Sequence, residues 1–257
     1  MKTLTKLAIP LAFLAVLGGC AANVKVTTNT PKKAIGIVVA IEMDAVKEKY
    51  GEPKEIIEKH GYTVHVYDND KYTLYFINSG AGEINSAGAA QVLISDFDVD
   101  MVMNFGVVGS LTEDIKTAQL LVVEEVIDID FGSDGWVNLP RGQHPEYDTA
   151  ILKTDETLVE MATKVDPTIT KVRCASTNSF RDTEEDKKAI HEQFNADICE
   201  MESAGIVYTC KRSGVPCLLI KATSDSLTGG GNEFFAELNR VSLLCFETLD
   251  QILQNME

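Results

Sequence analysis

The sequence predicts a single-domain α/β protein, and three observations carry this prediction. The chain has 257 residues, of which 45% are hydrophobic, enough for one large buried core. Short, continuous apolar runs that are typical of buried strands alternate with segments of helical period. No internal repeat and no second domain boundary interrupts this alternation.

The first half of the domain begins with a continuous apolar run at 34–41, which predicts a buried central strand. Two further apolar runs flank a polar Asp-Asn-Asp-Lys turn and are typical of a hairpin. The Ser-Gly-Ala-Gly sequence at 79–82 then leads into a helix rich in small residues, a layout that is common at ligand sites. The elements expected here are strands at 34–41, 62–67 and 72–77 and helices at 42–50 and 84–94.

The second half continues the alternation. A buried strand is expected to end at Phe105, before the Gly-Val-Val-Gly sequence at 106–109. The stretch 128–147 contains the single Trp136 and has no regular pattern, and loops of this length are often functional. The remaining expected elements are strands at 101–105, 120–126, 170–174 and 217–222 and helices at 158–164, 184–194, 203–212 and 234–253.

The N-terminal segment has the layout of an export signal. Lys2 and Lys6 precede an apolar stretch at 7–17, which is too short for a conventional membrane-spanning helix. The following Leu-Gly-Gly-Cys sequence resembles the lipobox of bacterial lipoproteins, in which the cysteine is lipidated. We therefore expect a signal peptide at 1–19, a lipidated Cys20 with a polar tether at 20–33, and the α/β domain at 34–257. The protein would be exported and lipid-anchored to a bacterial membrane; an ordinary signal peptide or an uncleaved anchor is the alternative.

Charge and cysteine content exclude several classes of partner. The net charge of -16 argues against nucleic acid, because phosphate binding needs a basic surface. The five cysteines other than Cys20 are odd in number and show no C-x-x-C spacing, which indicates buried free thiols rather than a disulfide framework. The four histidines also lack the spacing of metal ligands, so we expect no metal. These cysteines are Cys174, Cys199, Cys210, Cys217 and Cys245.

The stretch 198–205 places two carboxylates, Glu200 and Glu202, at a junction between a strand and a helix. Ligands bind at such junctions in open α/β sheets. The alternative is that both residues only begin a helix, where the helix dipole favours acidic side chains.

Five short motifs occur in the order found in one family, the nucleoside phosphorylase and nucleosidase superfamily. Within that superfamily the chain is most similar to the 5'-methylthioadenosine/S-adenosylhomocysteine nucleosidases. The resemblance implies a three-layer α/β/α sandwich with a central mixed sheet, hydrolysis of a small nucleoside without a cofactor, and a homodimer. The motifs are Ile-Gly-Ile at 35–37, Ser-Gly-Ala-Gly at 79–82, Asn-Phe-Gly at 104–106, Glu-Met-Glu at 200–202 and Ala-Thr-Ser-Asp at 222–225.

The resemblance also assigns roles around the nucleoside. Asp225 matches the acid that protonates or hydrogen-bonds the purine N7, and burial would keep its carboxyl group protonated enough to donate. Glu202 matches the carboxylate that accepts hydrogen bonds from the ribose 2'- and 3'-hydroxyls. Met201 would pack on the sugar and Phe180 would stack on the base, contributing roughly 1 kcal/mol. The alternatives are a helix-capping Asp225 beside Ser224, a core Met201 and a core Phe180.

The nucleophile is harder to assign. Phosphorylases of the superfamily hold phosphate with arginines, and none stands at 41–44 or 104–106. Asp44 is therefore expected to be the general base that activates water, with Glu42 as a fallback. Lys221 stands where these nucleosidases commonly have an arginine near the water.

Further residues are expected at the substrate. Ser79 and Ser224, at two strand ends, are expected to contact it, as is Lys221. Trp136 and Tyr147 are candidates for the pocket of the 5'-substituent, and the role of Glu200 is left open.

Three functions remain possible at this stage. The first is a hydrolase that releases adenine from 5'-thio-substituted nucleosides such as methylthioadenosine and S-adenosylhomocysteine. The second is a phosphorylase, or a hydrolase with another nucleoside preference. The third is a lipid-anchored nucleoside-binding protein with weak catalysis.

Overall fold

The computed structural model describes residues 32–132 and 138–256. The expected signal peptide at 1–19, Cys20, most of the tether and Trp136 lie outside these residues. Within the described ranges, none of the helices combines the length and apolar character needed to cross a bilayer.

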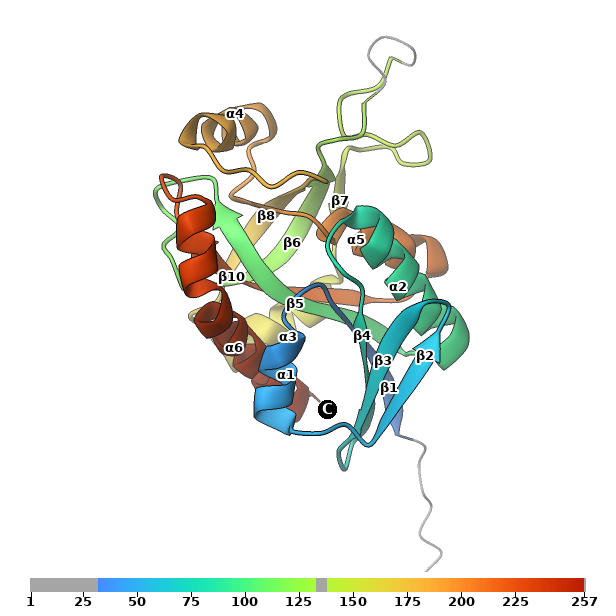
Figure 1. Cartoon of the computed structure of the whole chain (residues 1–257). Helices are drawn as coiled ribbons and strands as arrows, with labels where there is room; N and C mark the ends of the chain where they lie inside the picture. The colour runs from blue at the N-terminus through green and yellow to red at the C-terminus, as the bar shows by residue number, and fades with distance from the viewer. Residues whose placement is uncertain (1–31, 133–137, 257) are drawn as a thin grey trace, which may run out of the picture. The chain divides into compact units, whose positions relative to one another are not determined.

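A mixed sheet forms the centre of the domain (Figure 1). Its strands are β1 (Lys33–Val39), β2 (Glu55–Lys59), β3 (Tyr62–Asp68), β4 (Tyr72–Asn78), β5 (Met101–Ser110), β6 (Leu120–Asp128), β7 (Ile151–Lys153), β8 (Thr170–Ser176), β9 (Ile198–Glu200) and β10 (Cys217–Asp225). The strand order is β10-β6-β8-β9-β5-β1-β4-β3-β2; β7 pairs with β6, and β10 also pairs with β5. The strands β5, β9, β8, β6 and β10 therefore form a closed ring, from which β1, β4, β3 and β2 extend.

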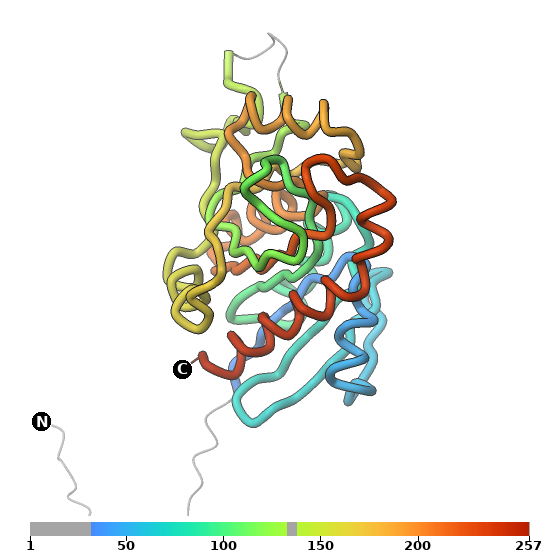
Figure 2. Tube along the Cα trace, turned by 90° about the vertical axis from the view of Figure 1, so that its left-hand side faces the viewer, coloured from blue at the N-terminus to red at the C-terminus, as the bar shows by residue number. Residues whose placement is uncertain are grey.

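Helices cover both faces of the sheet. They are α1 (Met43–Tyr50), α2 (Glu83–Phe97), α3 (Glu156–Val165), α4 (Glu184–Phe194), α5 (Ser203–Ser213) and α6 (Gly231–Asn255). One apolar core lies between the sheet and α1, α3 and α6, and a second lies between the sheet and α2 and α5. The long α6 crosses its face of the domain, as Figure 2 shows. The α/β/α architecture with a central mixed sheet is thus confirmed.

The buried strand β5 links these cores and is longer than expected. All ten of its residues are buried. Met103 and Phe105 belong to the core under α6, whereas Val102 and Val108 belong to the core under α2 and α5. The expected end at Phe105 is wrong, because the residues after it continue to pair with β10 as far as Gly109. This extension carries β5 along the floor of the pocket described below.

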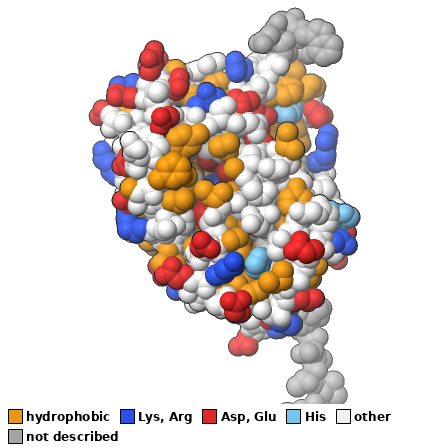
Figure 3. Space-filling view, viewed as in Figure 1, with side chains coloured by type: hydrophobic (Ala, Val, Ile, Leu, Met, Phe, Trp, Pro, Cys, Tyr) orange, Lys and Arg blue, Asp and Glu red, His pale blue; other side chains and the backbone are white. Residues whose placement is uncertain are grey.

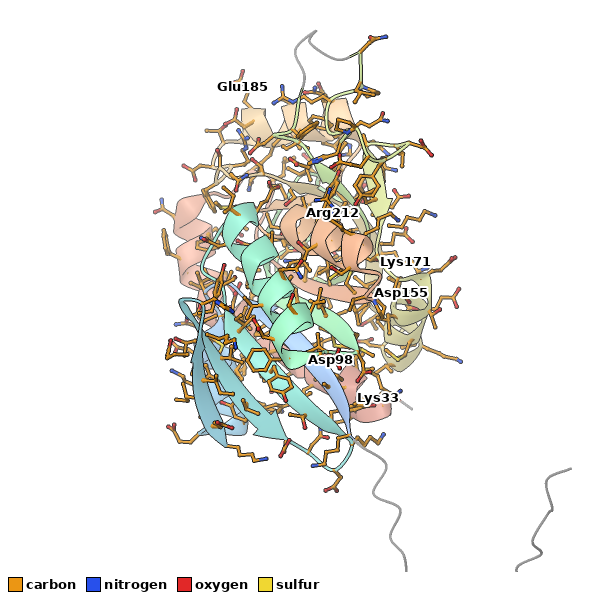
Figure 4. The ribbon with its side chains drawn as sticks, turned by 90° about the vertical axis from the view of Figure 1, so that its right-hand side faces the viewer. Lys33, Asp98, Asp155, Lys171, Glu185 and Arg212 are labelled. Atoms are coloured by element: carbon orange, nitrogen blue, oxygen red, sulfur yellow. The ribbon has the colours of Figure 1, made fainter. Side chains whose placement is uncertain are left out.

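Local signals explain several helix boundaries. The Asp155 side chain accepts a hydrogen bond from Leu158 N at 3.0 Å and caps the start of α3. Asp98, in the left-handed conformation, ends α2; Figure 4 labels both aspartates. The expected hairpin at 62–77 is present as β3 and β4. The short strands β2 and β7 were not anticipated, because β2 is an exposed edge strand and β7 has only three residues. The strand β9 is the one that the junction at 198–205 implied.

Candidate active site

A pocket opens at the carboxyl ends of β1, β5, β9 and β10, with about 590 Å³ of empty space, part of which is open to solvent. Four acidic residues at the strand ends line it: Glu42, Glu200, Glu202 and Asp225. The segment 177–181 and the start of α6 supply an apolar rim that includes Phe180 and Phe234. Hydrophobic side chains gather in a patch on the face shown in Figure 3. The site is therefore acidic in its depth and apolar at its mouth.

Glu42 connects β1 to α1 and points into the pocket. Its side chain is 5% exposed. One carboxylate oxygen accepts a hydrogen bond from Ile41 N at 2.9 Å, and the other accepts one from Val107 N at 3.2 Å. Burial raises the pKa of Glu42, although these hydrogen bonds and the charge of Lys221 oppose the rise. Gly106 leaves room for the carboxylate, because a Cβ atom there would lie 3.0 Å from Glu42 Oε1.

Asp44, the expected base, is not at the pocket. It lies in the first turn of α1 with its side chain exposed to solvent, and it does not line the cavity. The sequence predicts a helix at 42–50, on which the Glu42 side chain would face away from the pocket. In the structure α1 starts only at Met43, so Glu42 precedes the helix and its side chain turns back over β5. The geometry therefore favours Glu42 over Asp44 as the carboxylate at this position.

Glu200 and Glu202 have different surroundings although both are buried. Glu200 accepts hydrogen bonds from Glu202 N and Ser203 N at 3.0 Å, and its carboxylate lies 3.0 Å from Lys221 Nζ. Burial acts to raise the pKa of Glu200, but Lys221 and the backbone donors outweigh it and hold the pKa below the usual value. Glu200 is thus an ionised structural anchor for Lys221.

Glu202 has fewer partners and faces the cavity. Its Oε1 accepts a hydrogen bond from Gly82 N at 2.9 Å. Burial and the neighbouring charge of Glu200 raise the pKa of Glu202 to about 8. Gly82 has a φ of 102°, which favours glycine, and this conformation lets the turn after β4 present its N–H to the carboxylate. Glu202 is therefore available to accept further hydrogen bonds from a ligand.

Lys221 lies on β10 and is 1% exposed. Burial acts to lower its pKa, but the negative charges of Glu200 and Glu202 raise it above its ordinary value. A Cβ atom on Gly106 would lie 3.7 Å from Lys221 Nζ as well as 3.0 Å from Glu42 Oε1, so the lysine and Glu42 share the space above this glycine. Lys221 thus balances part of the negative charge in the pocket.

Asp225 ends β10 and is almost fully buried. Its Oδ1 lies 2.8 Å from Ser224 Oγ, and its Oδ2 lies 2.5 Å from Lys187 Nζ. Burial raises the pKa of Asp225, while the hydrogen bond and charge of Lys187 work against the rise. A Cβ on Gly109 would come within 2.9 Å of Asp225 Oδ2, so a side chain at this position of β5 would displace the carboxyl group. Sequence reasoning missed Lys187, because its helix is rich in charged residues and resembles a solvent-exposed one.

The other expected contact residues divide into two groups. Phe180, Met201 and Ser224 line the cavity, and the Phe180 ring packs against Phe234 at a centroid distance of 5.3 Å. Ser79 is buried and its Oγ lies 2.8 Å from Gly80 O, but it does not line the cavity. Tyr147 lies at a second cavity between α2 and α5.

Comparison with known proteins places this site in a family. A model of the family described as "Phosphorylase superfamily" matches residues 34–254. The chain belongs to the phosphorylase superfamily. Among members of the superfamily, the aminodeoxyfutalosine nucleosidase of Helicobacter pylori strain 26695 is 29% identical over 209 residues, covering 78% of this chain and 89% of the relative. The 5'-methylthioadenosine/S-adenosylhomocysteine nucleosidase of Staphylococcus aureus strain JH9 is 28% identical and covers 86% of this chain and 100% of its own length.

Solved structures of the superfamily agree with this assignment. The crystal structure of 5'-methylthioadenosine/S-adenosylhomocysteine nucleosidase from Helicobacter pylori with butyl-thio-DADMe-Immucillin-A superposes with a TM-score of 0.83. The two sequences are 25% identical, and the match covers 88% of this chain and 99% of the other. The superfamily fold is thus retained across nearly the whole described domain.

Proposed function

We propose that the protein hydrolyses the N-glycosidic bond of adenine nucleosides that carry a 5'-thio substituent, such as methylthioadenosine and S-adenosylhomocysteine, and releases adenine. The broader part of this statement, a nucleoside N-glycosyl hydrolase, follows from relatives that are named nucleosidases. The observation that carries the proposal is the placement of Glu42, Glu202 and Asp225 around one pocket.

Water suits this pocket better than phosphate does. A phosphorylase must hold a phosphate anion, and the part of the pocket next to Gly106 presents the Glu42 carboxylate instead. The cation there, Lys221, is already paired with Glu200. Arg181 also lines the cavity, but its Nη2 lies 3.0 Å from Thr177 Oγ1 and it pairs with Asp130. An anionic nucleophile would therefore meet net negative charge, whereas water would meet a base.

Glu42 is the residue to which we assign the base. A general base works best when its pKa is near the working pH, and burial shifts the pKa of Glu42 upward in that direction. The carboxylate is held by two backbone N–H groups, which fix its orientation. It would take a proton from the water that attacks the ribose C1'.

Glu202 and Asp225 would act on the two halves of the nucleoside. The free oxygen of Glu202 suits the ribose hydroxyls, and hydrogen bonds from a vicinal diol would favour its ionised form over the protonated one. The resulting charge stabilises the positive charge that develops on the ribose. Asp225 would protonate the purine N7, with Phe180 against the base and Met201 against the sugar.

The mouth of the pocket favours a thioether at the 5' position. The two named groups of relatives differ in the substituent carried by their substrates, so this end of the site decides the preference. Ile41, Phe180 and Phe234 line it, and the Ile41 and Phe180 side chains are half exposed. An apolar alkylthio group would bury this surface, and each Å² of apolar surface removed from water stabilises the complex by about 25 cal/mol.

Incubation of the full-length protein with methylthioadenosine, with and without phosphate, tests the proposal. Free adenine formed without phosphate is the expected result. Turnover that requires phosphate would establish a phosphorylase, and tight binding without turnover would establish a binding protein.

The cellular location and the homodimer are also proposals. We propose that the protein is exported and that lipid is attached at Cys20, as the Leu-Gly-Gly-Cys sequence suggests. Labelled fatty acid should enter the wild-type protein and not Cys20→Ala; equal labelling of both would refute lipidation there. Light scattering after gel filtration should give the mass of two chains, and a monomer mass would refute the dimer.

A further inference from the structure

Lys187 is a buried cation on a helix whose other charged residues face solvent. Its side chain is completely buried, whereas that of Lys188 is 51% exposed. Glu185 on the same helix points outward in Figure 4. Figure 2 shows α4 close to the turn that leads into α6, and Lys187 bridges the two. A lysine is rarely buried in this way unless it is paired.

The ammonium group of Lys187 has three acceptors, one for each of its protons. It donates to Asp225 Oδ2 at 2.5 Å, to Ser226 O at 2.7 Å and to Gly229 O at 2.9 Å. The lysine therefore fixes the Asp225 carboxyl group and the backbone that follows it at the same time. Its contacts join α4 to the segment between β10 and α6.

Few other groups influence the Asp225 carboxyl group. Ser224 Oγ contacts its second oxygen, and Glu233 from α6 and the Cys199 thiol from β9 are its nearby ionisable neighbours. Both Glu233 and Cys199 are acids, so neither can stabilise an anion at Asp225. Among the described residues, Lys187 is the cation that contacts this carboxyl group.

We propose that Lys187 is a positioning residue that stabilises the carboxylate left on Asp225 when Asp225 protonates the departing purine. This inference rests on the proposed function. The proton passes from Asp225 to the purine N7, and the bond between C1' and the purine breaks with its electron pair going to the purine. Asp225 becomes an anion beside the Lys187 ammonium, which keeps its own protons.

The energetic reason is the cost of a buried charge. An unpaired carboxylate is strongly unfavourable in a dry site, and this cost would oppose proton donation. An ammonium group at hydrogen-bonding distance offsets it and typically lowers the pKa of an acid by about 1–3 units. Burial and Lys187 act in opposite directions on the pKa of Asp225, and burial has the larger effect. Lys187 thus makes a buried acid a better proton donor.

The test compares Lys187→Met and Lys187→Arg with the matched control Lys188→Met, which removes the same charge from the exposed side of α4. The rate is measured against pH with methylthioadenosine and with 4-nitrophenyl 5-methylthioriboside, whose leaving group needs no proton. Lys187→Met should lower kcat on methylthioadenosine about tenfold and move the basic limb of kcat/KM up by about 1–3 pH units. Its rate on the nitrophenyl substrate should stay within about threefold of wild type.

The two control variants should behave differently. Lys187→Arg keeps a positive charge and should keep the basic limb in place, and Lys188→Met should match wild type. If Lys187→Met fails to fold, Lys187→Gln provides the same test, because it keeps hydrogen-bond donors without the charge.

Contrary outcomes separate the inference from the proposed function. A folded Lys187→Met or Lys187→Gln variant with an unmoved basic limb, or with equal losses on both substrates, would overturn the role of Lys187 alone. Wild-type protein that does not hydrolyse methylthioadenosine would overturn the proposed function. Full activity in Asp225→Asn would remove Asp225 as the acid, and the role of Lys187 with it.

Discussion

Replacement of Glu42 by glutamine tests the assignment of the base most directly. The substitution keeps the size of the side chain and removes its negative charge. Glu42 accepts hydrogen bonds from both Ile41 N and Val107 N, and the amide NH2 of glutamine cannot accept either of them. One backbone N–H would therefore lose its partner, at a cost of about 1–3 kcal/mol to stability.

The expected effect on catalysis is larger than this effect on stability. A general base contributes about 10²–10⁴-fold, which corresponds to roughly 3–5 kcal/mol in the activation free energy. We expect kcat for methylthioadenosine to fall by this factor in Glu42→Gln. Asp44→Asn is the control, because Asp44 is exposed and outside the pocket; it should stay within about twofold of wild type.

The pH profile adds a second measure of the same assignment. The base must be ionised to act, so activity should fall as the pH drops through the pKa of Glu42, which burial raises above its ordinary value. Adenine release is followed in initial-rate assays between pH 4 and 9, with circular dichroism to confirm folding. A large loss in Asp44→Asn together with near-normal activity in Glu42→Gln would refute the reasoning.

Two further predictions concern the site, and a third concerns the contact between α2 and α5. Asp225→Asn should suppress turnover by about 10²–10⁴-fold with a smaller effect on the Kd for methylthioadenosine, measured by calorimetry; near-normal turnover would contradict the acid role. Because the pKa of Glu202 is raised to about 8 in the fold, the stability that its protonated form contributes is full below about pH 4.5 and is lost as the pH rises to about 8. The melting temperature of Glu202→Gln should depend less on pH in this window than that of the wild type. Parallel curves of melting temperature against pH for the two proteins would argue against a raised pKa of Glu202. Gly205→Ala should lower the melting temperature, because its Cβ would lie 2.3 Å from Glu83 O and overpacking of this kind lowers the free energy of unfolding by about 1–3 kcal/mol. An unchanged melting temperature would show that α2 and α5 can separate without cost.

The architecture and much of the pocket could be predicted from the sequence. Apolar runs locate the buried strands, and the motifs at 200–202 and 222–225 locate Glu202 and Asp225 at strand ends. Phe180, Met201 and Ser224 also line the cavity. These features are local in sequence, so pattern and order were enough to find them.

Other features depend on contacts that no local pattern records. The choice between Glu42 and Asp44 depends on a helix that starts one residue later than expected, and helix ends are rarely determined to that precision from sequence. Lys187 and Lys188 are adjacent and identical in type, and only the packing of α4 on the segment after β10 separates the buried one from the exposed one. The extension of β5 depends on pairing with β10, more than 100 residues away in the chain.

The closed ring of strands divides the site into a part that resists change and a part that tolerates it. Lys221, Asp225 and Glu200 stand on strands hydrogen-bonded to neighbours on both sides, so displacing one of them would break pairing around the whole circuit. The rim residues Phe180 and Phe234 belong to a connecting segment and a helix instead. Substitutions at the rim can therefore change which 5' group is admitted while leaving the bond-breaking groups in register. Descendants of one such scaffold can acquire new substrates without rebuilding the catalytic machinery.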